Sequence, residues 1–225
     1  MRKFGTIVTL LLCTAMAAPK ETPPPSINMA TNGDFEKGTS APKGWDKPDG
    51  KRVRWGKGFG KEGSRGLRIE MDQEIAFGYG QGHFSSPIPV EPRTEYRVSV
   101  DVRSDNPNAI IFIKGYAKVR GTLREVYSKH KEAHFDRYLA KEVGSGQFVH
   151  QSFTFHPRHG TYQVEHIKVW LYGYLKPGVL DFDNVRVERV GKAEVPAAEK
   201  RSTKKPVRAP STNNSKPIYL DPKDF

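Results

Sequence analysis

The sequence predicts an all-β protein, an antiparallel β-sandwich of the jelly-roll type. Three observations lead to this fold class. Short stretches that alternate apolar and polar residues recur along the chain, clusters of Pro, Gly and Asn separate them, and no helical apolar period lasts beyond two turns. Many short strands divided by regular turn signals are typical of sandwiches and jelly rolls.

The expected strands follow one another through the middle of the chain. The alternation is clearest in residues 67–71 and 96–103. Strand-like patterns are also present in residues 110–118, 148–155, 164–175 and 179–190. The best helical candidate is residues 126–143, which are highly charged and only weakly amphipathic.

The start of the chain has the pattern of an export signal. Arg2 and Lys3 give a basic start, a short apolar run follows, and Ala17 ends a small-x-small cleavage pattern. The apolar run is too short to span a bilayer. We therefore expect a signal peptide at residues 1–17, a linker at 18–27, and export to the periplasm, the cell surface or the medium.

Cys13 is the only cysteine and lies within the predicted signal peptide. Lipidation of Cys13 is an alternative, but Leu12 stands where a small residue is expected. After cleavage the chain has no disulfide, no thiol nucleophile and no cysteine ligand for zinc. Its stability must then come from an apolar core, with or without a metal.

Residues 191–225 differ in composition from the rest of the chain. They are rich in Ala, Pro, Lys and Ser, and they hold eight basic and four acidic residues, a third of the net charge of +12. Such a segment buries too little apolar surface to offset its ordering entropy. We expect a disordered basic tail, either simply solvated or in contact with an anionic surface or another envelope protein. The pI of about 9.7 would suit nucleic acid, but the predicted export argues against it.

Residues 28–190 are enough for one domain with one core. Their motifs are Asn32-Gly33-Asp34-Phe35-Glu36, Pro42-x-Gly44-Trp45, Gly66-Leu67-Arg68-Ile69, the stretch from Pro89 to Ser99, and Asp181-Phe182-Asp183-Asn184-Val185. In order and spacing these motifs resemble the carbohydrate-binding modules of the galactose-binding-like jelly-roll group, the cellulose- and xylan-binding type. The resemblance implies a polysaccharide ligand and a structural calcium near the paired terminal strands.

The first and last of these motifs place carboxylates beside apolar residues that should be buried. The first and last strands of a sandwich often lie side by side, so these carboxylates could hold a hard cation through oxygen ligands. The candidates are Glu36 and Asp183, with Asp34 as a third. Alternatively, Asp34 caps a turn and Asp183 accepts backbone hydrogen bonds. Asn184 follows Asp183 where the family often has a second aspartate, which puts one ligand in doubt.

The period-two rule assigns the remaining side chains to faces. Three strands then place basic, acidic and aromatic residues away from the core. Aromatic rings suit sugar rings, and Lys and Arg suit carboxylate or sulfate groups. The alternative is that the aromatic residues pack beneath a loop or in the core. The candidate binding residues are Trp170, Tyr172, Tyr116, Lys168, Lys114, Arg97 and Asp101.

Three classes of function remain open. The first is an exported, non-catalytic carbohydrate-binding module for a neutral or acidic polysaccharide. The second is a glycan-active enzyme such as a lyase; a glycosidase is disfavoured because only Asp101 is evident on the predicted face, where two carboxylates are needed. The third is a structural or assembly protein of the envelope. A lyase would use the set Tyr172, His166, Lys168 and Arg97.

Overall fold

The computed structural model describes residues 27–106, 108–126, 135–139, 146–157 and 163–192. The predicted signal peptide, all but one residue of the predicted linker, and almost all of the predicted tail lie outside these ranges. No helix in the described ranges is long and apolar enough to cross a membrane.

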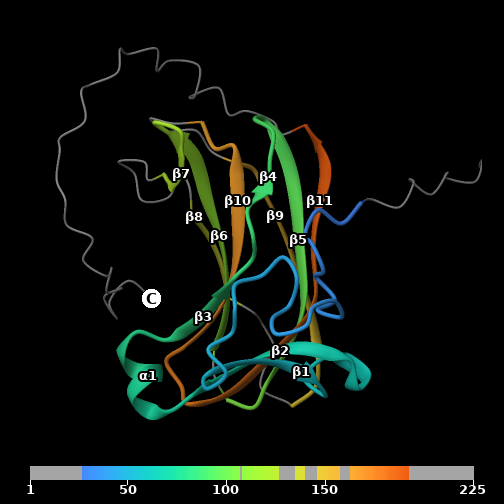
Figure 1. Cartoon of the computed structure of the whole chain (residues 1–225), viewed down its shortest axis with the longest axis vertical. Coiled ribbons are helices and arrows are strands. Elements are labelled where there is room, and N and C mark those ends of the chain that lie inside the picture. Colours follow the sequence, from blue (N-terminus) through green and yellow to red (C-terminus); the bar gives the residue numbers. More distant parts are fainter. Residues whose placement is uncertain (1–26, 107, 127–134, 140–145, 158–162, 193–225) are drawn as a thin grey trace, which may run out of the picture.

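The predicted antiparallel β-sandwich is confirmed, with two sheets packed face to face (Figure 1). The first sheet has the order β1-β2-β11-β5-β9, with β1 at Val53–Lys57, β2 at Arg65–Met71, β11 at Gly178–Lys192, β5 at Thr94–Ser104 and β9 at Val149–Phe155. The second has the order β3-β10-β6-β7, with β4 on β10 and β8 on β6. Its strands are β3 at Gln81–Phe84, β4 at Ile88–Pro89, β6 at Asn108–Val119, β7 at Thr122–Glu125, β8 at Phe135–Leu139 and β10 at His166–Tyr174.

The main core lies between the sheets and follows the predicted alternation. On β5 the inward set is almost inaccessible to solvent, and β10 and β6 supply the opposite wall. Burial of this apolar surface is the principal stabilising term of such a fold. The inward residues of these three strands are Tyr96, Val98, Val100 and Val102 on β5, Ile167, Val169 and Leu171 on β10, and Ile111 and Ile113 on β6.

Two short helices and one strand depart from the sequence-based expectation. Helix α1 at Gln73–Gly78 has an apolar stretch too short for a periodic signal, and it is fixed by the side chain of Asp72, which accepts a hydrogen bond from Ile75 N at 2.9 Å. A 3₁₀ turn, η1, covers Lys61–Gly63. The helical candidate is wrong for Phe135–Leu139, because pairing with β6 makes this segment the strand β8.

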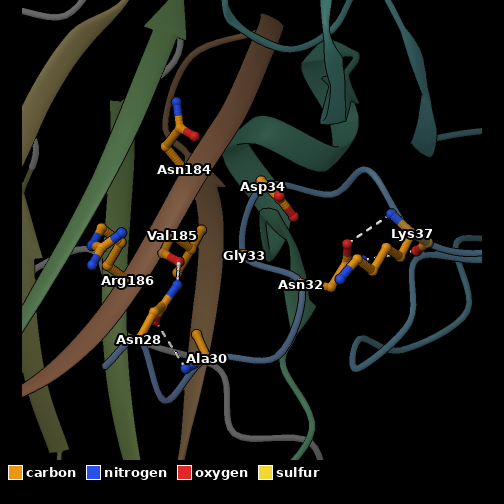
Figure 2. Close-up of a pocket in the computed structure, with 9 residues that line it drawn as sticks. All are labelled: Asn28, Ala30, Asn32, Gly33, Asp34, Lys37, Asn184, Val185 and Arg186. Atoms are coloured by element: carbon orange, nitrogen blue, oxygen red, sulfur yellow. Dashed lines mark hydrogen bonds between the residues drawn. The ribbon is translucent and has the colours of Figure 1, made fainter. Parts of the chain in front are cut away.

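The first and last motifs lie side by side, as expected. The first is a turn, however, and not the strand-like stretch that we expected. Val185 N donates to Gly33 O at 2.8 Å, and Asn28 Nδ2 donates to Val185 O at 3.0 Å, so the turn is attached to the middle of β11 (Figure 2). The contact leaves no room for a side chain, because a Cβ on Gly33 would lie 1.8 Å from Val185 O.

We expect Gly33→Ala to destabilise the domain. The added methyl group would force the turn away from β11, at a cost of about 1–3 kcal/mol. Thermal melting measures the effect. Gly191→Ala is the control, since it lies on the same strand with no heavy atom within 4 Å of the position of its Cβ. Equal melting temperatures for the two variants would contradict this account of the turn.

Candidate functional site

The outer face of the second sheet brings together five of the seven candidate binding residues. β6 and β10 are neighbours, and their register places Lys114 opposite Lys168 and Phe112 opposite Trp170. Side chains of alternate residues on both strands therefore share the face that points away from the main core. The five are Lys114, Tyr116, Lys168, Trp170 and Tyr172.

Trp170 is the centre of an aromatic cluster on this face. Its ring stacks on Phe84 of β3, with centroids 4.8 Å apart and planes 8° apart. Phe112 and Tyr172 lie at 5.0 and 4.5 Å from it. Phe112 is fully buried, whereas Trp170 and Phe84 are half-buried. The indole therefore has a rigid base, and part of its surface is open to solvent.

Two lysines flank this cluster with different partners. Lys114 Nζ lies 4.4 Å from the centroid of the Trp170 ring and forms an ion pair with Glu125 at 3.2 Å. Lys168 Nζ lies 5.6 Å from the ring centroid of Tyr116. Among the described residues, no carboxylate forms an ion pair with Lys168. This face thus holds a half-buried cation available for an anionic group.

Tyr172 faces outward, as predicted, but it is buried, with 4% of its surface exposed. Its hydroxyl donates to the carbonyl oxygen of Tyr79, and burial, with a smaller contribution from Tyr174, raises its pKa to about 12. A tyrosine that acts as a base needs the opposite shift. The residue therefore packs the cluster, and its hydroxyl is occupied within the protein.

Arg97 and Asp101 are separated from the other five residues, and the single predicted face is wrong in this respect. Both lie on β5, which pairs with β9 and β11 in the first sheet. Alternation along a strand tells which residues share a face, but it does not tell which sheet the strand joins. The residues proposed for a lyase are not brought together either, because Arg97 lies on the sheet opposite His166 and Lys168.

Asp101 points away from the core, as predicted, yet it is buried by its neighbours. His150 Nδ1 lies 2.7 Å from Oδ1, while Asn184 Nδ2 donates to Oδ2 at 3.0 Å and Lys61 Nζ lies 3.5 Å from it. Burial alone would raise the pKa of Asp101, but the hydrogen bonds from His150 and Asn184 and the charge of Lys61 outweigh it and lower the pKa.

The contacts of Asn184 account for an amide, and not a carboxylate, at the position after Asp183. It lies in a bulge of β11 with φ of 51°, a left-handed conformation that Asn tolerates. Its amide donates to Asp101, which a carboxylate cannot do. An aspartate here would bring a third negative charge beside Asp101 and Asp183, which lie directly opposite each other on β5 and β11.

Asp183 already has protein donors on its oxygens. Lys61 N and Ser64 Oγ donate to Oδ2 at 2.9 and 3.0 Å, and Asn184 N donates to Oδ1 at 2.7 Å. Burial raises the pKa of Asp183, the nearby Asp101 charge adds to the rise, and these hydrogen bonds offset it in part. The alternative given for Asp183, that it accepts backbone hydrogen bonds, is confirmed.

The three candidate metal ligands do not converge. Glu36 Oε1 accepts from Arg65 N at 2.7 Å, and Asp34 is exposed at the rim of a hollow that Asn32, Asn184 and other residues line (Figure 2). Within the described ranges, no group of three or more His, Cys, Asp or Glu side chains could hold a metal ion. Glu36, Asp183 and Asp34 therefore do not form such a group.

A buried ion-pair network that the sequence analysis missed lies next to these carboxylates. Asp181 is almost fully buried between Arg68, which donates to it at 2.7 and 2.9 Å, and Arg103, which donates at 2.9 and 2.6 Å. Arg103 also donates to Gly58 O at 3.3 Å. The pairing depends on the strand register, so neither arginine could be assigned to Asp181 from the sequence.

Comparisons with known proteins support the fold. No protein-family model and no curated protein matches the sequence. A tailspike protein of bacteriophage CBA120 shares the fold, with 13% identity and a TM-score of 0.53, over 73% of this chain and 22% of that one. Other structural neighbours are carbohydrate-binding modules, the kind of protein that the sequence resembles.

Two of these modules show the extent of the likeness. A family 16 carbohydrate-binding module is 13% identical, with a TM-score of 0.48, over 71% of this chain and 99% of that one. A xylan-binding domain of Paenibacillus barcinonensis Xyn10C is also 13% identical, with a TM-score of 0.48, over 71% and 93%. At these identities the comparisons establish the fold and no more.

Calcium binding stays a prediction of the sequence resemblance. An ion between Glu36 and Asp183 would have to displace the Lys61, Ser64 and Arg65 donors. If calcium is nevertheless bound, chelation should lower the melting temperature more than it lowers ligand affinity. The measurement is thermal melting with and without a chelator, and an unchanged melting temperature would contradict the prediction.

We expect Tyr172→Phe to leave ligand binding within about twofold of the wild type, because its hydroxyl contacts Tyr79 and is not presented to a ligand. Loss of this hydrogen bond should cost about 0.5–1.5 kcal/mol of stability. Affinity electrophoresis and thermal melting measure the two effects. Abolished binding with a normal melting temperature would restore Tyr172 as a ligand-contacting residue.

Proposed function

We propose that this chain is a carbohydrate-binding protein that holds a polysaccharide against the outer face of the second sheet. The observation that carries the proposal is the half-buried Trp170, stacked on Phe84 and flanked by Lys114 and Lys168. A rigid aromatic ring offers a sugar an apolar surface, and the lysines offer hydrogen bonds and charge.

We further propose that the ligand carries acidic groups. Lys114 is neutralised by Glu125, but Lys168 lacks an ion-pair partner among the described residues, and its ammonium lies over aromatic rings. Such a half-buried cation gains most from a carboxylate or sulfate that replaces its lost hydration. We also propose that the chain binds without catalysis, as the resemblance of its motifs to carbohydrate-binding modules implies, and that it is exported, as the pattern of residues 1–17 indicates.

Affinity electrophoresis through gels that contain polygalacturonate, glucuronoxylan or neutral galactan tests both proposals. We expect retardation by an acidic polymer, and Lys168→Gln should weaken it roughly tenfold because a charged hydrogen bond is lost. Arg97→Gln is the matched control. It also removes one positive charge, but an exposed one on the opposite sheet, and it should bind like the wild type.

Three results would count against this function. Retention on no polysaccharide would overturn it, and equal losses in the Lys168 and Arg97 variants would show that only net charge matters. Unsaturated uronate absorbance on incubation with the acidic polymers would show a lyase. Trp170→Ala should lose binding as well as stability, since the indole contacts three other rings, so Lys168→Gln is the sharper test.

A further inference from the structure

Helix α1 and the turn after it expose two aromatic rings. Phe77 is 57% exposed and Tyr79 is 53% exposed, within three positions of each other. Among the residues whose exposure the structure describes, the other exposed large apolar side chains are Ile27 and Val190, and both lie elsewhere. The rings of Phe77 and Tyr79 belong neither to the main core nor to the aromatic cluster around Trp170.

The segment that carries the two rings is firmly attached to the sandwich. Ile75 and Ala76 are buried, and the side chain of Asp72 accepts from Ile75 N. Gly80 N donates to Ile75 O at 2.8 Å, and Leu175 N, just beyond β10, donates to Ala76 O at 2.9 Å. A ring held on such a support loses little conformational entropy when a ligand stacks on it.

The same segment adjoins the aromatic cluster of the second sheet. The carbonyl of Tyr79 accepts the hydroxyl proton of Tyr172, whose ring lies 4.5 Å from that of Trp170. Gly80 has φ of +67°, and a Cβ there would lie 2.5 Å from the Tyr172 hydroxyl. Figure 1 shows α1 at one end of β10 and β6, on the side that faces away from β5 and β11.

The charge around the two rings differs from that around Trp170. Residues 72–81 contain Asp72 and Glu74 and no Lys or Arg, and Gln73 and Gln81 add amide groups. Carboxylate and amide side chains suit sugar hydroxyls, and a surface without a net positive charge does not attract anionic sugars or anionic lipid headgroups. Asp72 forms an ion pair with Arg52 at 3.9 Å, and the exposed Lys176 follows Leu175, so acidic and basic groups balance near these rings, whereas Lys114 and Lys168 flank Trp170.

We propose that Phe77 and Tyr79 form a second stacking subsite that takes a neutral sugar unit of the same polysaccharide. The subsite rests on the proposed function and extends it along the chain of the ligand. The polysaccharide would then carry an acidic unit near Lys168 and a neutral unit at α1. This arrangement selects mixed polymers such as glucuronoxylan over uniformly acidic polygalacturonate.

Calorimetric titration with glucuronoxylan and with a ladder of its oligosaccharides tests the subsite. Wild-type affinity should rise with oligosaccharide length. In the variant Phe77→Ala/Tyr79→Ala, affinity should no longer rise with length. We expect roughly a three- to tenfold loss of affinity for the longest oligosaccharides and no loss for the shortest. Val190→Ala is the matched control, because it truncates an exposed apolar residue on the first sheet.

The outcomes separate the subsite from the proposed function. Unchanged affinity of the double variant for every length, while Lys168→Gln still weakens binding, would overturn the subsite alone. Equal losses of affinity at every oligosaccharide length would also overturn the subsite, because they would mean that the substitutions disturbed the aromatic cluster around Trp170. Binding of no glucuronoxylan fragment by the wild type would overturn both. Capture on phosphatidylcholine vesicles that depends on Phe77 would show a lipid surface in place of a sugar.

Discussion

The pairing of β11 with both of its neighbours is the constraint on which the rest of the structure depends. β11 lies between β2 and β5, and its bulge at Asn184 receives the N-terminal turn through the Val185–Gly33 hydrogen bond. The same strand places Asp181 and Asp183 on the outer face of the first sheet. A shift of its register by one residue would bury these acids in the apolar core and expose Phe182.

This constraint also explains what the sequence could and could not predict. Alternation along β5 and β10 identified the inward residues correctly, because burial imposes a period of two on any strand of a sandwich. It could not assign β5 and β10 to different sheets, since partners such as Asp101 and His150 are far apart in the chain. Arg97 and Asp101 were therefore grouped wrongly with the lysines and aromatic residues of the second sheet.

Short elements were missed for a related reason. The segment that became β8 lies within the helical candidate at residues 126–143, and its pairing with β6 makes it a strand. Helix α1 has six residues, fewer than two turns, so no apolar period can reveal it. Asp72 before Gln73 was the available signal, a capping residue at the first turn. The rings of Phe77 and Tyr79 were overlooked with it.

The two outer faces of the sandwich differ in how their charges are satisfied. On the first sheet the buried acids Asp101, Asp181 and Asp183 take donors from the protein itself, so a ligand would first have to break internal contacts. On the second sheet the half-buried Lys168 is paired with rings and with no acid of the described residues. Since an incompletely compensated cation costs free energy in the unbound protein, a ligand anion that contacts it recovers that cost. This asymmetry, more than the number of aromatic residues, is the reason for proposing that a ligand binds on the second sheet.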